Sequence, residues 1–518
     1  MKVSCIDYSA TGAFSSLVLD YLRKDAKLRP FYAHFPEISS FPALIQERNF
    51  PAERRQVLVE ELNRQYQGVE ITKAVQANIS ALADAQTFTI TTGHQLNLFT
   101  GPLYFIYKVI TAINTARELQ KAYPDQTFVP VYWMATEDHD FAEVNHFTLF
   151  GKQYAWESDA KGAVGRFSTD GLNELLDEMP ESYPLFEQAY TGSATLAEAM
   201  RQIVNGLFGE YGVVCVDGDS RALKQAFSTI AQRELTEQVG FKAVTETNAA
   251  LEQHYKPQVM VREINLFYLD QNLRERIVQE DGHYKVLNTD LVFTREEIVA
   301  LTQEQPEKFS PNVVLRPLYQ ELVLPNLAYI GGGAEVAYWF QLKGTFEAYS
   351  VPYPAVMLRN SAMYITKPNA QRMEKLGFTV TEMFRELPEL KKRLAELLNQ
   401  QEVSLQQQRD AVEEAFRQIE ELAQSIDPTL VKAVGAETQK ALNSFQMLEK
   451  KLNKAVENKN DTAYNQLANL KEKLFPTGVL QERVDNLLTY QTNNPNFIQE
   501  LLAAFEPFSY CFTVLQEE

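Results

Sequence analysis

The first 385 residues alternate short apolar runs with stretches of helical periodicity. Phe88–Thr92 and Phe128–Ala135 are rich in β-branched and apolar residues, and Tyr211–Val216 is a third such run. Helical patterns follow around Tyr104–Ile113 and Arg221–Thr236. Buried strands that alternate with helices are typical of a mostly parallel sheet, so the pattern predicts an α/β core.

Other segments of this region extend or interrupt the alternation. Ile264–Leu269 and Ala355–Leu358 are further candidate strands. Residues 158–210 are helical and loop-rich, and we interpret them as an insertion. We expect Thr100 to cap the helix that follows the first strand, with Pro102 in its first turn.

The pattern changes near Leu387, where Gly and Pro become scarce. Apolar residues then recur every seven positions, at Leu398, Leu405, Val412, Ile419 and Ile426. The companion row is Leu394, Gln401, Gln408, Ala415 and Leu422. This period predicts a coiled-coil helix of about 37 residues, roughly 55 Å long.

A second helix is expected to start at Asp427-Pro428, because Asp is a good N-cap and Pro a good first residue. The two helices would form an antiparallel hairpin. The predicted division is a core over 1–384, an α-helical arm over 385–475 and a terminal segment over 476–518 that packs back on the core.

Composition narrows the class of protein. With 518 residues and 45% hydrophobic residues, the chain is expected to fold into two to four units. A net charge of −19 argues against a nucleic-acid partner. No secretory signal and no stretch long enough to span a membrane is found, so we expect a cytoplasmic protein. Three scattered cysteines predict no disulfide framework and a reducing compartment.

The polar motifs follow the predicted strands, where α/β folds bind their ligands. The segment Thr92–Tyr104 has two glycines, Gly93 and Gly101, and opens a helix. Its backbone N–H groups would suit an anion. The pattern alone fits either a ligand loop or an ordinary strand–helix turn.

The segment Glu137–His146 holds four carboxylates and two histidines within ten positions. Such density is costly unless a cation, an amine or a proton transfer uses it. Three interpretations remain open: a divalent metal site, a site that binds and deprotonates a substrate ammonium group, and a solvated acidic loop with one capping Asp.

Three further segments carry candidate binding groups. They are Lys256–Arg276, Phe309–Glu321 and Tyr329–Trp339. The three glycines in the last can form an anion nest or a simple turn. The candidate carboxylate or phosphate ligands are Arg262, Arg316 and Arg359, although single arginines are more often structural. No G-x-S-x-G elbow supports covalent catalysis.

Taken together, these motifs resemble the bacillithiol synthase family of cysteine ligases. The resemblance rests on the segments TGHQLNLFTGPLYFIYK, VPVYWMATEDHDFAEVNH, REINLFYLD and FSPNVVLRPLYQELVLPNLAYIGGGAEVAYW. It covers nearly the whole chain. Two positions depart from the family pattern: His94 stands where glutamine is common, and Gly332-Gly333-Ala334 where Gly-Pro-Gly variants occur.

The resemblance implies a Rossmann-like core related to nucleotidyltransferases and class I aminoacyl-tRNA synthetases, with connecting-peptide insertions and a coiled-coil dimerisation domain. It implies the last step of bacillithiol biosynthesis, in which the carboxyl group of L-cysteine is joined to the 2-amino group of glucosaminyl malate. Hydroxide is a poor leaving group, so we expect ATP with Mg²⁺ to activate the carboxylate. No tightly bound metal is predicted.

The candidate residues follow from these roles. The expected catalytic residues are Asp138, His139, Asp140 and His94, with His139 or Asp140 as the base. The expected substrate- or nucleotide-binding residues are Gly93, Gln95, Asn97, Thr100, Gly101, Tyr104, Glu137, Asn145, His146, Arg262, Asn265, Asn312, Arg316, Gly331, Gly332, Gly333, Glu335 and Arg359.

Two other functions compete with this one. A nucleotidyltransferase-like enzyme of another pathway would share the core and use a different acyl acceptor. A non-enzymatic coiled-coil adaptor would bind a nucleotide only as a structural ligand. Polar motifs at several strand ends favour an enzyme, because an adaptor does not need them.

Overall fold

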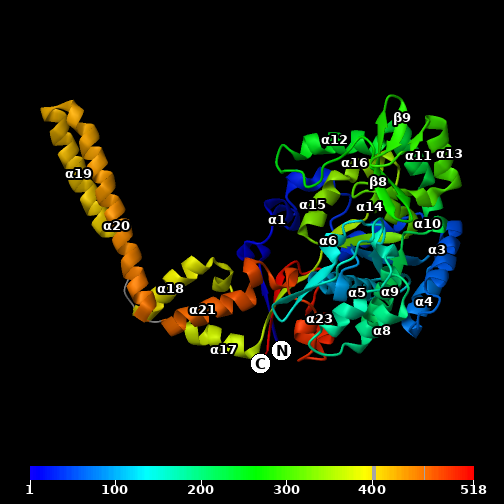
Figure 1. Ribbon diagram of the computed structural model, residues 1–518, viewed down its shortest axis with the longest axis horizontal. Coiled ribbons are helices and arrows are strands. Elements are labelled where there is room, and N and C mark those ends of the chain that lie inside the picture. Colours follow the sequence, from blue (N-terminus) through cyan, green and yellow to red (C-terminus); the bar gives the residue numbers. More distant parts are fainter. Residues whose placement is uncertain (400–403, 460, 518) are drawn as a thin grey trace.

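The computed structural model describes residues 1–399, 404–459 and 461–517. A globular core holds most of the chain, and a long helical arm projects from it (Figure 1). The N- and C-terminal strands lie next to each other at the side of the core where the arm begins.

The core is built on a five-stranded parallel sheet, as the alternation of strands and helices predicts. Its strand order is β13-β12-β2-β3-β6, and every neighbouring pair is parallel. The strands are β2 (Thr87–His94), β3 (Thr127–Met134), β6 (Val214–Asp217), β12 (Asn326–Gly331) and β13 (Ala355–Leu358).

This order places the switch point of the sheet between β2 and β12. The chain runs outward from β2 through β3 to β6, then returns to β12 on the other side and continues to β13. Open α/β sheets bind ligands at the carboxyl ends of strands at such a point. The inner strand β12 was not predicted as a strand, although all six of its residues are buried.

Helices cover both faces of the sheet. The helix α5 (Tyr104–Ala122) packs on β2 and β3, and most of its residues are buried. The expected Thr100 cap is wrong: the N-cap is Leu103, without a side-chain hydrogen bond, and Thr100 has a positive φ of 67°. Within residues 158–210, α9 (Leu196–Phe208) contacts β6.

A second sheet is antiparallel and lies beside the first. Its order is β10-β9-β8-β7-β11. The strands are β7 (Leu266–Asp270), β8 (Leu273–Glu280), β9 (His283–Val286), β10 (Val292–Phe293) and β11 (Phe309–Pro311). The candidate strand at Ile264–Leu269 therefore does not belong to the parallel core, because it pairs antiparallel with β8 and β11.

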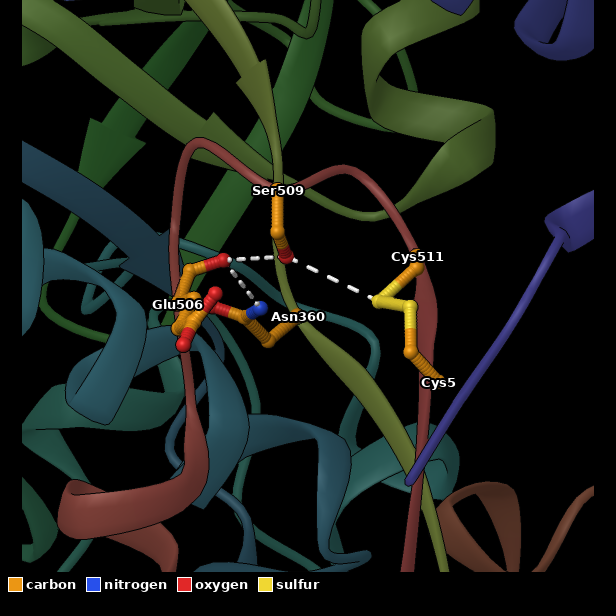
Figure 2. Close-up of a disulfide and its surroundings, with 5 residues drawn as sticks. All are labelled: Cys5, Asn360, Glu506, Ser509 and Cys511. Carbon is orange, nitrogen blue, oxygen red and sulfur yellow. Dashed lines mark hydrogen bonds between the residues drawn. A yellow bond between two sulfur atoms is a disulfide. The ribbon is translucent and has the colours of Figure 1, made fainter. Parts of the chain in front are cut away.

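A third sheet joins the two ends of the chain. In it β15 (Phe512–Gln516) lies between β1 (Lys2–Ile6) and β14 (Ser361–Ile365). A disulfide links Cys5 to Cys511, with Cα atoms 5.8 Å apart (Figure 2). The expectation that the cysteines form no disulfide is wrong, because a sequence separation of 506 hides a contact between neighbouring strands.

The arm is a helical hairpin with a broader base. Its outer part pairs α19 (Gln406–Ile426) with α20 (Val431–Lys459), and its base packs α18 (Leu387–Asn399) on α21 (Asp461–Leu474). Asp427 begins the turn as predicted, since its carboxylate accepts from the N–H of Thr429 at 2.9 Å. The first expected long helix is divided, because Ser404 and Leu405 lie outside α18 and α19. The heptad residue Gln401 lies outside the described residues.

The remaining elements connect these units. They are α1 (Ser16–Leu22), α2 (Phe41–Glu47), α3 (Ala52–Gln65), α4 (Lys73–Ala81), α6 (Phe141–Val144), β4 (His146–Leu149), β5 (Lys152–Ala155), α7 (Leu172–Asp177), α8 (Pro184–Gly192), α10 (Arg221–Lys224), α11 (Ser228–Glu237), α12 (Val239–Leu251), α13 (Arg295–Glu304), α14 (Arg316–Val323), α15 (Gly333–Gln341), α16 (Lys343–Ala348), α17 (Lys367–Leu376), α22 (Leu488–Gln491) and α23 (Phe497–Ala504). None of the described helices is long and apolar enough to cross a membrane.

Candidate active site

Two adjoining cavities open at the carboxyl edge of the parallel sheet. The switch-point cavity lies between the ends of β2 and β12, and the β7 cavity lies between the end of β3 and the antiparallel sheet. Each has a volume of about 400 Å³. Both are lined by Trp133, Ala135, Asp138, Val313 and Arg316, so a ligand in one contacts the wall of the other.

An ion pair closes the floor of the switch-point cavity. Lys108 of α5 pairs with Glu335 of α15, and its ammonium also donates to the carbonyl of Gly93 at 3.0 Å. Glu335 accepts from the hydroxyl of Tyr329 at 2.7 Å and from the N–H of Gly332 at 2.8 Å. Burial pushes the pKa of Glu335 upward, but Lys108 outweighs it and holds the pKa below its usual value.

These contacts change the interpretation of the glycine run. The N–H of Gly332 already donates to Glu335, so the chain's own carboxylate occupies one donor of the expected anion nest. Gly93 has a different constraint. A Cβ at Gly93 would lie 3.2 Å from the Tyr329 hydroxyl, tighter than ordinary contact, and 3.6 Å from Arg316. A side chain there would press on the cavity wall.

His94 lies at the end of β2 and stacks on Phe105, with ring centroids 5.3 Å apart. Burial lowers the pKa of His94 well below its usual value, and the charges of Lys108 and Arg359 lower it further. Its Nε2 has no hydrogen-bond partner within the described part of the chain. His94 is therefore neutral and a weak base, which suits a hydrogen bond to a ligand better than proton abstraction.

Three arginines line the switch-point cavity, Arg316, Arg359 and Arg483, and the first two also make hydrogen bonds within the protein. Arg359 donates to Glu482 at 2.7 Å, and to the Asn360 carbonyl and the Ser361 hydroxyl. Arg316 donates to Gln320 at 2.9 Å, while its Nη2 has no partner among the residues described. The Nε of Arg359 likewise has no partner there, so both arginines keep a donor for a carboxylate or phosphate oxygen.

Asp138 lies where the two cavities meet. Burial works to raise its pKa, but hydrogen bonds from His139 and Gln95, with the charge of Arg274, outweigh burial and hold the pKa well below its usual range. The amide of Gln95 donates to it at 2.8 Å and the N–H of His139 at 2.7 Å. Asp138 is therefore a permanent carboxylate, able to hold a cation but too acidic to take a proton near neutral pH.

Glu137 is the group whose protonation changes near neutral pH. It lines the β7 cavity and pairs with Lys224 of α10, whose side chain is fully buried. Burial raises the pKa of Glu137 to about 7; Lys224 lowers it and Asp219 adds to the rise. A carboxyl group with such a pKa can accept a proton from an ammonium group and release it.

His139 and Asp140 do not line either cavity. The guanidinium of Arg274 donates to Nδ1 of His139 at 2.6 Å, so this nitrogen must be the lone-pair side of the ring. Arg274 also bonds the Ser310 hydroxyl at 3.1 Å. The interaction uses the basic nitrogen of His139 and orients the ring beside the cavity.

The predicted residues divide into two groups. Those that line one of the cavities are Gly93, His94, Gln95, Tyr104, Glu137, Asp138, Arg262, Asn312, Arg316, Gly332, Gly333, Glu335 and Arg359. Those that line neither are Asn97, Thr100, Gly101, His139, Asp140, Asn145, His146, Asn265 and Gly331.

Residues of the second group make hydrogen bonds within the loops around the cavities. Asn265 is buried and donates to Glu234 at 2.7 Å, and its carbonyl oxygen accepts from Asn312 at 2.9 Å. Asn145 donates to the Trp156 carbonyl at 3.1 Å, at the base of the β4–β5 hairpin. These side chains hold the loops that carry the cleft residues.

Several cleft residues were missed from the sequence. Lys108 lies one helical turn after Tyr104, within the mostly apolar first half of α5, which is a usable signal. Lys224 and Arg274 resemble ordinary surface charges in the sequence. Arg483 lines the switch-point cavity but follows the arm in sequence, and no local pattern marks it.

The described residues contain no group of three or more His, Cys, Asp or Glu side chains arranged to hold a metal ion. In the acidic segment the carboxylates have other partners. Asp138 bonds Gln95 and Glu137 pairs with Lys224, while the amide of Gln95 also donates to Glu143 at 2.7 Å.

A Rossmann-like sheet with a polar cleft at its switch point defines a ligand-binding enzyme core, here joined to a coiled-coil arm. Residues 1–360 match the family described as "Bacillithiol biosynthesis BshC, N-terminal Rossmann-like domain". Residues 362–517 match "Bacillithiol biosynthesis BshC, C-terminal coiled-coil domain". The chain belongs to this family, which confirms the resemblance found in its motifs.

Curated relatives agree along the whole length. A protein of Flavobacterium johnsoniae named "Putative cysteine ligase BshC" is 41% identical, over 99% of this chain and all of that one. Relatives of the same name from Chlorobaculum tepidum and Bacillus cytotoxicus are 30% and 26% identical, over 98% and 92% of this chain and 95% and 93% of theirs.

Among solved structures, an arginyl-tRNA synthetase of Campylobacter jejuni is 11% identical, covering 88% of this chain and 96% of its own, with a TM-score of 0.21. So low a score adds nothing to the assignment.

The raised pKa of Glu137 predicts how stability depends on pH. Its pKa is 4.5 when unfolded and about 7 when folded, so the native state binds the proton more tightly. The free energy of unfolding should therefore fall by about 3 kcal/mol, relative to Glu137→Gln, as pH rises from 4 to 8. Urea unfolding of both proteins across this range, followed by tryptophan fluorescence, measures the difference.

The matched control is Glu118→Gln, which removes an exposed carboxylate of α5. Its pH profile should run parallel to that of the wild type. If Glu137→Gln also ran parallel, Glu137 would titrate normally and would have no special place in the cleft.

Proposed function

We propose that this protein joins the carboxyl group of L-cysteine to the 2-amino group of glucosaminyl malate, with ATP as the activating cosubstrate. The observation that carries the proposal is the pair of adjoining cavities that share Asp138 and Arg316. Two substrates bound side by side can react across that shared wall. Family membership supports a role in bacillithiol biosynthesis.

The β7 cavity suits the amine substrate. Arg262, Arg274 and Arg276 line it, and guanidinium groups bind carboxylates such as those of malate. Arg274 is already engaged by His139, so Arg262 and Arg276 are the ones available for the malate carboxylates. Asp138 and Glu137 lie in the same cavity and face the position where the amino group would bind.

The proton of the substrate ammonium group goes to Glu137 in this proposal. An amine attacks a carbonyl only as the neutral base, so the ammonium proton must leave first. Asp138 stays ionised and holds the ammonium group, whereas Glu137 has a pKa of about 7 and can take the proton. His139 and Asp140 support the loop rather than act as the base.

The switch-point cavity suits the carboxyl substrate and the nucleotide. ATP would convert the carboxylate of L-cysteine into a form with a good leaving group. The free Nη2 of Arg316 can bind a phosphate or carboxylate oxygen, and neutral His94 can hydrogen-bond a ligand. Arg359 and Arg483 add two more guanidinium groups to the wall.

We also propose that the arm forms a homodimer. Seven large apolar side chains on its outer hairpin are between 45% and 70% exposed: Ile419, Leu422, Ile426, Leu430, Met447, Leu448 and Leu452. The hairpin alone does not bury this row. A second copy, with the same row, can bury it in a coiled coil.

The location proposed is the cytoplasm, where ATP and free L-cysteine are available. No nucleic-acid partner is proposed, because the net charge is −19.

The direct test incubates the purified chain with L-cysteine, glucosaminyl malate and ATP. Mass spectrometry should detect the cysteinyl amide of glucosaminyl malate. Asp138→Ala should lower kcat/KM by about 100-fold or more because it removes the carboxylate that holds the amine, and Glu137→Gln by a similar factor because it removes the base. Undiminished turnover in both Asp138→Ala and Glu137→Gln would exclude the acidic segment from catalysis, whereas His139→Ala and Asp140→Ala should lower turnover less.

The same assay separates the malate site from the chemistry. Arg262→Met should raise KM for glucosaminyl malate by about tenfold while kcat changes little, and should leave the slow reaction of plain glucosamine unchanged. Arg417→Met, on the exposed face of the arm, is the matched control. Product formation without glucosaminyl malate would instead favour another acyl acceptor, and no ligation at all would favour the adaptor.

The dimer has its own measurement. Sedimentation equilibrium of the full chain should give twice the 59.1 kDa chain mass. Leu448→Glu with Leu452→Glu should give a folded monomer, because charges on the exposed row oppose its burial. Gln439→Glu, at an exposed polar position of α20, should stay dimeric. A wild-type monomer at micromolar concentration would contradict the proposal.

A further inference from the structure

The disulfide between Cys5 and Cys511 lies at the surface, where small molecules can reach it. Cys5 is exposed on β1, and Cys511 is partly exposed just before β15 (Figure 2). The third cysteine, Cys215, is fully buried in β6, and burial raises its pKa to about 12. Only the first two cysteines are placed to react with a dissolved thiol.

The strand that carries Cys5 is weakly held by packing. β1 pairs with β15 on one side only, and four of its five residues are exposed. The disulfide fixes this edge strand to the loop that precedes β15. Once the disulfide opens, β1 is held to β15 mainly by backbone hydrogen bonds. Residues 506–511 then lose their covalent link to β1.

A chain of hydrogen bonds leads from the disulfide to the cleft. The hydroxyl of Ser509 lies 3.7 Å from Sγ of Cys511 and donates to the carbonyl of Glu506 at 2.9 Å. That carbonyl also accepts from the side-chain amide of Asn360 at 3.1 Å (Figure 2). The carbonyl of Asn360 in turn accepts from Arg359, which lines the switch-point cavity.

Ser509 makes this series of hydrogen bonds sensitive to whether Cys511 is in a disulfide or is a free thiolate. Its hydroxyl has one proton, and beside a disulfide that proton goes to the Glu506 carbonyl. A Cys511 thiolate is a stronger acceptor than a carbonyl and would compete for the same proton. The loop that contacts Asn360 then loses one of its internal hydrogen bonds.

We propose that Cys5 and Cys511 form a reversible thiol–disulfide exchange site for low-molecular-weight thiols, and that its state controls turnover through Ser509 and Asn360. In a reducing compartment a disulfide is usually a catalytic or redox-sensing one. The proposal rests on the proposed function in one respect: the product of that reaction is itself a thiol of this class, so the site would sense the product.

The exchange balances as two ordinary steps. A thiolate RS⁻ attacks the more exposed Cys5 sulfur, which forms a Cys5–S–S–R mixed disulfide and expels the Cys511 thiolate beside Ser509. A second RS⁻ attacks the R-bearing sulfur of the mixed disulfide, which forms RSSR and frees the Cys5 thiolate. The reverse reaction uses RSSR as the oxidant, and no other reagent is needed.

The direction of control follows from the contacts. The disulfide keeps residues 506–511 and Asn360 in place beside Arg359, so the oxidised protein is the more active form. Abundant thiol opens the disulfide and slows the enzyme, and a rise in RSSR restores it.

The first test reads the exchange itself by intact mass on the full chain. The protein is equilibrated in buffers of glutathione and glutathione disulfide at several ratios, acid-quenched and alkylated. Cys5 and Cys511 should pass reversibly between alkylated and disulfide forms, while Cys215 stays free of glutathione throughout. Cys511→Ser should trap one glutathione on Cys5. This readout needs no ligase activity, so it stands whether or not the proposed reaction is correct.

The second test reads turnover at each redox ratio. The kcat of the wild type should rise about threefold or more with the oxidised fraction. Ser509→Ala should exchange normally but show the same kcat in both states, and the double variant Cys5→Ser with Cys511→Ser should not respond to the ratio. The proposal is overturned if both cysteines stay reduced at every ratio, if glutathione adds only to Cys215, or if exchange leaves the wild-type kcat unchanged.

Discussion

The buried ion pair between Lys108 and Glu335 joins the two halves of the Rossmann-like sheet at the place where ligands bind. Lys108 extends from the helix after β2, and Glu335 from the helix after β12. The Lys108 side chain is 4% exposed and that of Glu335 23%, so the lysine charge in particular is not tolerated without its partner. The pair also holds the Gly93 carbonyl and the Gly332 N–H. It thereby fixes both strand ends that form the switch-point cavity.

The same constraint explains which groups remain available for chemistry. Most buried charges at the carboxyl edge are neutralised within the protein, as Arg359 is by Glu482. What remains is one donor each on Arg316 and Arg359 with no partner among the described residues, an ionised Asp138, and Glu137 with its pKa near neutrality. Anion binding, cation binding and proton acceptance therefore meet in one cleft, as a bond-forming ligase of this family needs.

Much of this architecture can be predicted from the sequence because local patterns carry it. β2 is a β-branched run, β3 and β13 are apolar runs, and the Asp427 turn has a clear start signal. The inner strand β12 was missed because its residues run directly into the glycine motif, which is typical of a loop. The sheet to which β7 belongs depends on partners far away in sequence, which no local pattern encodes.

The candidate site shows the same division. Gly93, Asp138 and Arg316 follow strands or open helices, so their place at the sheet edge was predictable. The choice of Glu137 instead of His139 as the base was not predictable from the sequence. It depends on Lys224 and Arg274, which contact the acidic segment from elements far away in the chain. The Cys5–Cys511 contact joins the two ends of the chain and has no sequence signal.

The most direct test of the central claim is a double-mutant cycle on kcat/KM for ligation with Lys108→Met, Glu335→Gln and the double variant. We expect the double variant to lose about as much as either single one, a coupling of about 2 kcal/mol, whereas additive losses would contradict the account.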